Sequence, residues 1–218
     1  MKYAAICDIM SASEAEDRVN IMIRNIVLDM GNVLLDYNPN VILDKVFENE
    51  EDKQIILKEL FGGPEWVQGD LGIITNSERY DGVSRRVPER LHHGLKRCVE
   101  EWDICMIPVE GAKDFCRFVR EKGYGMYVLS NACSMFYKYF PKYFPLEDFD
   151  GIVVSSDEHI VKPDRRIYEI ILERYGLEAG ECLFIDDRKD NTLGALGVGM
   201  NAHIFRNDYD DIIHRYGL

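Results

Sequence analysis

The sequence predicts an α/β protein, a doubly wound, Rossmann-like parallel sheet with an inserted helical subdomain. Short apolar runs rich in β-branched residues alternate with helix-length segments, which is the order of strand and helix in a parallel sheet. The runs are apolar throughout rather than at every second position, as expected for strands buried on both faces. One long stretch, from about residue 40 to residue 107, shows helical patterns only.

Five short apolar runs are predicted to be the strands of the sheet. They are Ile26–Leu28, Gly125–Leu129, Gly151–Val154, Cys182–Ile185 and Ala202–Phe205. Between them, segments such as "AKDFCRFVREKGY" and "RRIYEIILERYGL" repeat apolar residues every three or four positions, which predicts amphipathic helices. Right-handed connections of this kind place helices on both faces of the sheet.

The stretch from residue 40 to residue 107 is predicted to be a separate helical subdomain. Thr75 followed by Glu78 predicts a capping box at the start of one helix, and Pro88 fits the first turn of another. The α/β core is then predicted to comprise residues 23–39 and 108–218. Residues 1–22 are predicted to be an N-terminal extension, with Met22 as an alternative natural start.

The amino-acid composition indicates which classes of binding partner are excluded. The 218 residues are 46% hydrophobic and 30% charged, which is typical of a globular protein. The net charge of −13 argues against nucleic acid or an anionic membrane as partner, and no run approaches the roughly 18 to 20 apolar residues of a membrane span. The scattered cysteines have no zinc or disulfide spacing, which indicates reduced thiols and a cytoplasmic location. A homo-oligomer is left open. The cysteines are Cys7, Cys98, Cys105, Cys116, Cys133 and Cys182.

Polar residues stand at the ends of four predicted strands. They are Asp29 after the first, Ser130 and Asn131 after the second, Lys162 after the third, and Asp186 and Asp187 after the fourth. The carboxyl ends of parallel strands share one edge of the sheet, so these side chains are expected to converge on one crevice.

The chemistry of this set predicts phosphoryl transfer. Carboxylates from different strand ends are suited to a hard divalent ion such as Mg²⁺. Lysine, hydroxyl and amide groups donate hydrogen bonds to phosphate oxygens. Beside such an ion, the Asp29 carboxylate is placed to attack phosphorus and form an aspartyl phosphate, so the predicted partner is a small phosphorylated metabolite.

The four motifs resemble those of the haloacid dehalogenase superfamily, with a helical cap inserted after the first motif. The first motif is "DMGNV" at Asp29, and the second contains Ser130 and Asn131. The third is Lys162 in "KPDRRIY", and the fourth is the acidic pair in "FIDDRKDN". The resemblance covers nearly all of the chain after Ile23.

The resemblance implies a role for each matching residue. Asp29 would be the nucleophile, and Ser130 and Lys162 would share the catalytic machinery. The metal ligands would be Asp29, the Gly31 carbonyl, Asp186 and Asp187. Phosphate would be bound by the Asn32 and Val33 backbone N–H groups and by Ser130, Asn131 and Lys162, and Asn191 would support the acidic loop.

Gly31 departs from the family pattern, because most phosphatases of the superfamily carry a second acid at this position. Superfamily dehalogenases also lack this acid, so a metal-independent 2-haloacid dehalogenase is one alternative, and a noncatalytic phospho-ligand binder is another. The acidic pair Asp186–Asp187 favours the phosphatase. "DMGNV" with an intact acidic pair also resembles a bacterial subgroup that includes α-D-glucose-1-phosphate phosphatase, which suggests a sugar phosphate substrate.

The helical cap is expected to set specificity. In "FGGPEWVQGDLGIITNSERY", Trp66, Gln68 and Arg79 are candidates for contact with the substrate. The alternative places Trp66 in the core between cap helices and Arg79 on a solvated face.

Overall fold

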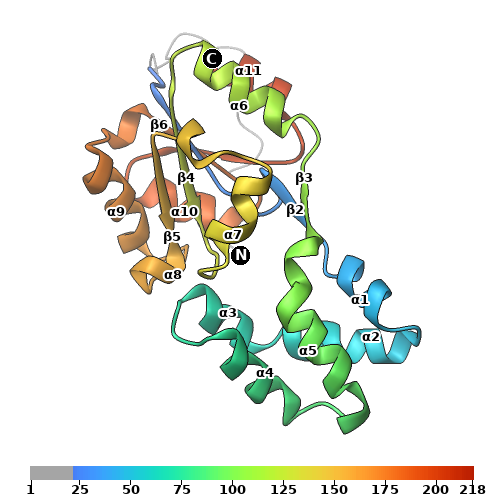
Figure 1. Cartoon of the computed structure of the whole chain (residues 1–218). Coiled ribbons are helices and arrows are strands. Elements are labelled where there is room, and N and C mark those ends of the chain that lie inside the picture. Colours follow the sequence, from blue (N-terminus) through green and yellow to red (C-terminus); the bar gives the residue numbers. More distant parts are fainter. Residues whose placement is uncertain (1–21) are drawn as a thin grey trace, which may run out of the picture.

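The computed structural model describes residues 22–218. A five-stranded parallel sheet has the strand order β5-β4-β1-β6-β7, which confirms the predicted Rossmann-like α/β fold (Figure 1). The strands are β1 (Asn25–Leu28), β4 (Gly125–Ser130), β5 (Gly151–Val154), β6 (Cys182–Asp186) and β7 (Asn201–Ile204). Apart from Met22, the predicted N-terminal extension lies outside the described residues.

Helices cover both faces of the sheet because successive residues of each buried strand point to opposite sides. Ile26 and Leu28 pack with Phe115 of α6 (Ala112–Glu121) and Ile212 of α11 (Tyr209–Tyr216). Val27 packs on the other face, with residues of α9 (Arg165–Tyr175) and α10 (Lys189–Gly197). Two one-turn helices, α7 (Phe136–Tyr139) and α8 (Ser155–Glu158), follow β4 and β5.

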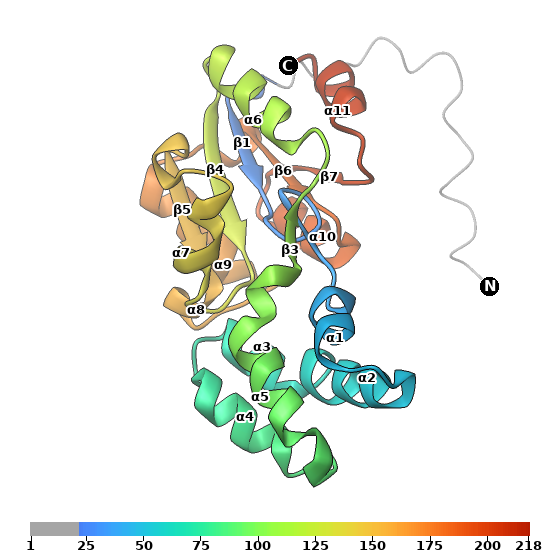
Figure 2. The same ribbon diagram turned by 45° about the vertical axis from the view of Figure 1, so that its right-hand side comes forward.

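The segment between β2 and β3 is helical and has its own apolar core. Its helices are α1 (Asn40–Val46), α2 (Glu50–Ile56), α3 (Pro64–Asp70), α4 (Asn76–Ser84) and α5 (His92–Glu101). They lie together beyond the carboxyl ends of the strands (Figures 1 and 2). Fully buried residues such as Ile42, Leu60 and Leu95 pack in one cluster at their centre. We call these five helices the cap.

A short antiparallel ribbon joins the cap to the core. β2 (Leu35–Tyr37) pairs with β3 (Met106–Pro108). The expectation of helix alone up to residue 107 is therefore wrong at its C-terminal end, because a three-residue strand is too short to show an alternating pattern. The ribbon brings the chain entering the cap next to the chain leaving it.

Local signals are confirmed at the start of α4. Thr75 accepts a hydrogen bond from the Glu78 N–H, and the Glu78 carboxylate accepts one from the Thr75 N–H, which is the predicted capping box. Single turns complete the chain at Leu57–Phe61 (π), Glu89–Leu91, Trp102–Cys105, Phe140–Lys142, Leu146–Asp148 and Ala179–Glu181 (3₁₀). Within residues 22–218, no helix has the length and apolar character needed to cross a membrane.

Candidate active site

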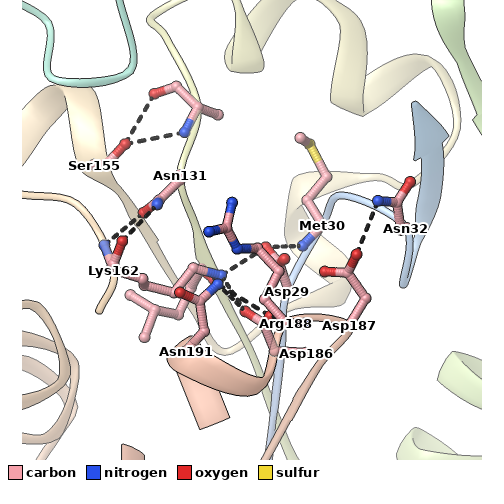
Figure 3. Close-up of polar contacts among 12 residues, drawn as sticks. Asp29, Met30, Asn32, Asn131, Ser155, Lys162, Asp186, Asp187, Arg188 and Asn191 are labelled. Atoms are coloured by element: carbon pink, nitrogen blue, oxygen red, sulfur yellow. Dashed lines mark hydrogen bonds and ion pairs between the residues drawn. The ribbon is translucent and has the colours of Figure 1, made fainter. Parts of the chain in front are cut away.

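The structure brings the strand-end residues together at the carboxyl edge of the sheet (Figure 3). Asp29 follows β1, and Asp186 and Asp187 stand at the end of β6, which is hydrogen-bonded to β1. One carboxylate oxygen of each aspartate lies within 4.8 Å of the others. Asp29 and Asp186 are buried, and Asp187 is half-buried. Three oxygen donors at this spacing form a candidate site for a hard divalent cation.

Lys162 lies beside the carboxylates and is itself buried. Its Nζ is 2.7 Å from Asp29 Oδ1 and 2.7 Å from Asp186 Oδ2, and it donates to the Leu129 carbonyl at 2.8 Å. These contacts use all three N–H donors of the ammonium group. Lys162 thus joins the end of β4 to the acidic cluster and holds its charge at the centre of the site.

The carboxylates remain under-compensated despite Lys162. Burial raises the pKa of Asp29 to about 7, Lys162 opposes the rise, and Asp186 and Asp187 add to it. For Lys162, burial lowers the pKa but the Asp186 and Asp29 carboxylates outweigh it, so the net shift is upward. Within residues 22–218, Lys162 is the one cation that forms ion pairs with this cluster, through Asp29 and Asp186, and a divalent ion among these oxygens would supply further positive charge.

The raised pKa of Asp29 makes a prediction about stability without metal. Between its ordinary value of 3.8 and the folded-state value of about 7, the folded protein holds a proton that the unfolded chain has released. The free energy of unfolding should therefore fall as pH rises through this window in the presence of a chelator. Denaturant unfolding of wild type and Asp29→Asn at several pH values measures it. In the variant, the free energy of unfolding should not show this fall with pH. The same pH dependence in both proteins would contradict the assignment.

Neighbouring amides orient the acidic pair. Asn191 Nδ2 donates to both carboxylate oxygens of Asp186, at 3.0 and 2.9 Å, and the Arg188 N–H donates to Asp186 Oδ1 at 2.8 Å. The Asn32 side chain donates to Asp187 Oδ2 at 2.9 Å. The supporting position expected for Asn191 is thus occupied as described, and the side chain of Asn32 has a contact that the sequence did not indicate.

The backbone N–H groups that are free to bind phosphate in the turn after Asp29 are not the ones that were expected. The Asn32 N–H donates to the Leu35 carbonyl at 2.7 Å, and the Val33 N–H donates to the Met30 carbonyl at 3.4 Å. Both N–H groups are therefore used within the turn, and Val33 is fully buried, so the structure does not offer them to a phosphate. The Gly31 N–H has no hydrogen-bond acceptor among residues 22–218 and lines the cavity described below.

In the second motif, Asn131 forms two hydrogen bonds with the Lys162 backbone, and the Ser130 hydroxyl has no partner among the described residues. Asn131 Oδ1 accepts from the Lys162 N–H at 2.7 Å, and Asn131 Nδ2 donates to the Lys162 carbonyl at 3.0 Å. This reciprocal pair fixes the backbone that carries the lysine. The Ser130 hydroxyl is fully buried and has no partner in the described part of the chain. An unpaired buried hydroxyl costs free energy. Ser130 itself is not among the residues that line the cavity, whereas Asn131 is.

A cavity of about 470 Å³ lies between the sheet edge and the cap. Its floor includes Asp29, Asn131, Lys162 and Asp187. Its other side is aromatic, and the rings contact one another at centroid distances of 5.1 to 5.6 Å between successive members. The aromatic residues are Tyr37, Phe61, Trp66, Trp102 and Tyr139. The polar floor and the aromatic wall suit a charged head group joined to an apolar or ring-shaped body.

The three cap candidates have different positions. Trp66 lines the cavity and also packs against the cap core. Arg79 is 1% exposed, so it is not on a solvated face, and it lies outside the lining of this cavity. Its guanidinium group lies 4.7 Å from the Trp66 ring centre and donates to Asn76 Oδ1 at 3.1 Å and to the Glu65 carbonyl. Gln68 is half-buried and does not line the cavity.

Sequence reasoning missed a further acid in the cavity. Asp70, the last residue of α3, lines it from the cap side. The only sequence signal was an acid set in "GDLG", within the segment expected to face the crevice. The aromatic wall was also missed. Its rings come from β2, the cap and α7, which are far apart in sequence and share no local pattern.

The fold and the acidic cluster together define a class, an enzyme that works at the carboxyl edge of a Rossmann-like sheet beneath an inserted cap. The model of the haloacid dehalogenase-like hydrolase family matches residues 23–199, and the chain belongs to this family of hydrolases.

Three relatives show how far the likeness extends. A sesquiterpene phosphatase of Aspergillus oryzae is 28% identical over 188 residues, which are 80% of this chain and 85% of the relative. A haloacid dehalogenase family enzyme of Bacteroides thetaiotaomicron, solved with magnesium and inorganic phosphate, is 25% identical, with a TM-score of 0.64 over 85% of this chain and 96% of that chain. The L-2-haloacid dehalogenase of Xanthobacter autotrophicus is 15% identical, with a TM-score of 0.59 over 83% of this chain and 76% of that chain, and shares the fold.

Proposed function

We propose that this hydrolase is a Mg²⁺-dependent phosphatase that cleaves a small phosphorylated metabolite through an aspartyl phosphate on Asp29. The observation that carries the proposal is the acidic cluster with Lys162 in its midst: three carboxylates within 4.8 Å of one another and a lysine 2.7 Å from two of them. Two relatives support the proposal: one is named a phosphatase, and the other was solved in complex with magnesium and inorganic phosphate.

The residues fit a magnesium site. Asp29, Asp186 and Asp187 would hold the ion through carboxylate oxygens, with the Gly31 carbonyl as a further ligand proposed from family resemblance. Bound there, the ion supplies positive charge against the phosphoryl group and against the repulsion within the cluster. Asn191 and Asn32 keep the acidic pair oriented through their side-chain amides.

The chain's own groups then account for the first chemical step. The Asp29 carboxylate attacks phosphorus, and the ester oxygen leaves with the bonding electrons. Lys162, already held at 2.7 Å from Asp29 Oδ1, lies close to where negative charge accumulates. The Gly31 N–H is the donor that we assign to the phosphoryl oxygens in place of the Asn32 and Val33 amides, and the Ser130 hydroxyl is a further donor proposed from family resemblance.

The two alternatives are less well supported. A dehalogenase needs no metal. Here the negative charge of Asp29, Asp186 and Asp187 exceeds the positive charge of Lys162, which favours a bound cation. The likeness to a haloacid dehalogenase concerns the fold alone. A noncatalytic phospho-ligand binder would share the site but would not turn over, so phosphate release separates it from the phosphatase.

The aromatic wall favours an alcohol with an apolar body as the leaving group. Tyr37, Trp66, Trp102 and Tyr139 line the cavity, and a relative is named a sesquiterpene phosphatase. The sugar phosphate suggested by sequence resemblance stays a prediction, since aromatic rings also stack on sugar rings. A C15 isoprenyl monophosphate and glucose 1-phosphate, compared at equal concentration, distinguish the two substrate classes.

Magnesium dependence is the decisive test of the function. Phosphate release from monoesters should occur with Mg²⁺, stop in excess chelator, and return when Mg²⁺ is restored. A panel of isoprenyl, sugar and aryl phosphates measures this with inorganic phosphate as the readout. Release that persists in chelator would contradict the proposal, as would the absence of release from every ester.

A further inference from the structure

The cavity contains one carboxyl group outside the proposed metal cluster. Among the described residues that line it, the acids are Asp29, Asp187 and Asp70. Asp29 and Asp187 belong to the cluster, whereas Asp70 comes from the C-terminal end of cap helix α3. It therefore faces the same space as the proposed nucleophile, but from the cap side.

The surroundings of Asp70 favour a carboxyl group that exchanges a proton near neutral pH. Burial raises its pKa to about 7, and Arg79 only partly opposes the rise. Its carboxylate receives no hydrogen bond from residues 22–218. Tyr139 lines the same cavity, and after burial and Cys133 the charges of Asp70 and Asp29 both raise its pKa.

The core holds the Asp70 backbone in place. Ser155 Oγ donates to the Asp70 carbonyl at 2.6 Å and accepts from the Ala132 N–H at 3.0 Å. The adjacent Leu71 carbonyl lies 2.9 Å from His159 Nδ1. These contacts join the end of α3 to α8 and, through Ser155, to the loop after β4, which carries Asn131 of the second motif. In this arrangement of cap and core, Asp70 lines the cavity that holds Asp29.

The turn after β1 provides no acid for this task. Gly31 occupies the position at which most phosphatases of the superfamily carry an acid, and a Cβ built there would meet no atom within 4 Å. The space beside the nucleophile is therefore open. Asp36, the next acid along the chain, is exposed on β2 and does not line the cavity.

We propose that Asp70 of the cap is the general acid–base of this phosphatase, acting in place of the acid absent at Gly31. This inference rests on the proposed function. In the first step Asp29 Oδ bonds to phosphorus, the ester P–O bond breaks, and the Asp70 proton passes to the leaving oxygen, giving alcohol and aspartyl phosphate. In the second step Asp70 takes a proton from water, which attacks phosphorus; the Asp29 acyl phosphate bond breaks, and phosphate and both original side chains are restored.

Leaving-group dependence tests the proposal. Benzyl phosphate and p-nitrophenyl phosphate each carry one aromatic ring, but benzyl alkoxide needs a proton to leave, whereas p-nitrophenolate does not. Asp70→Asn should lower kcat/KM for benzyl phosphate by roughly 10²- to 10⁴-fold and for p-nitrophenyl phosphate far less. kcat/KM is the correct readout because it reports only the steps up to the aspartyl phosphate. Asp81→Asn, on the exposed side of cap helix α4, is the matched control and should leave both values unchanged.

The pH profile gives a second readout that a structural role would not move. For benzyl phosphate, the wild-type kcat/KM should decline above about pH 7 as Asp70 loses its proton, and Asp70→Asn should lack that decline. The titratable groups that face Asp70 are Arg79, Tyr37, Tyr139 and Cys133, and no shift brings the two tyrosines or the cysteine toward neutral pH.

The possible outcomes separate the role of Asp70 from the phosphatase function itself. Equal losses for the two esters would show that Asp70 binds substrate or holds the cap, and would overturn the proposal. No loss for either ester would also overturn it. If the wild-type protein released phosphate from neither ester nor from any other monoester with Mg²⁺, the proposed function itself would fail. Equal thermal unfolding midpoints of wild type and Asp70→Asn ensure that a loss is not one of folding.

Discussion

Asp29→Asn is expected to lower phosphate release by roughly 10⁴-fold or more, the scale of loss seen when an enzyme's nucleophile is removed. The amide is a poor nucleophile toward phosphorus, and it also removes one charge from the proposed magnesium site. The side chain stays nearly the same size, so the packing around this buried position should persist. Initial rates with Mg²⁺ on the best substrate of the panel measure the effect.

The control for this loss is Asp36→Asn. Asp36 is an exposed aspartate on β2, seven positions after Asp29, and should tolerate the same substitution without loss of activity. A second observation identifies the covalent step. Wild-type protein quenched in acid during turnover should carry one phosphoryl group on the peptide that contains Asp29, and the variant should carry none. Turnover by Asp29→Asn at the wild-type rate would contradict the assignment.

The sheet and the strand-end residues could be predicted because their signals are local. A strand buried on both faces is a continuous apolar run, and the residue that follows it lies at the carboxyl edge of the sheet. Asp29, Lys162 and Asp186 therefore converge as the topology requires, with Nζ 2.7 Å from both carboxylates. The three-residue ribbon of β2 and β3 had no such signal, because its pairing joins segments about 70 positions apart.

The part of the site that comes from the cap could not be predicted, because it depends on how two separately packed units meet. Arg79 has a sequence context typical of a solvated helix face, yet it is buried against Trp66 of α3 and donates to the Glu65 carbonyl of the same helix. Close approach explains why: a Cβ at Gly69 would lie 1.7 Å from Arg79 Nη2, so only glycine leaves room for the guanidinium group. The position of Asp70 follows from the same packing and from the Ser155 contact, neither of which has a sequence pattern.

The electrostatics of the site lead to a prediction about Lys162, because it is the cation that touches both Asp29 and Asp186 in the interior. Lys162→Met keeps the length of the side chain and removes the charge. Two buried carboxylates then lose their partner, and the free energy of unfolding in chelator should fall by about 3–5 kcal/mol, as for other broken buried ion pairs. Phosphate release should be lost as well. Denaturant unfolding of the purified variant measures the stability term.

Magnesium should reduce this destabilisation, and that distinguishes a charge effect from a packing effect. A divalent ion bound by Asp29, Asp186 and Asp187 would replace part of the positive charge that Lys162 provides. The difference in unfolding free energy between wild type and Lys162→Met should therefore be smaller with Mg²⁺ than in chelator. Lys189→Met, at an exposed position on α10, is the control and should cost little in either condition. An equal loss with and without Mg²⁺ would mean that the ion does not share the carboxylates with the lysine, and would count against the proposed metal site.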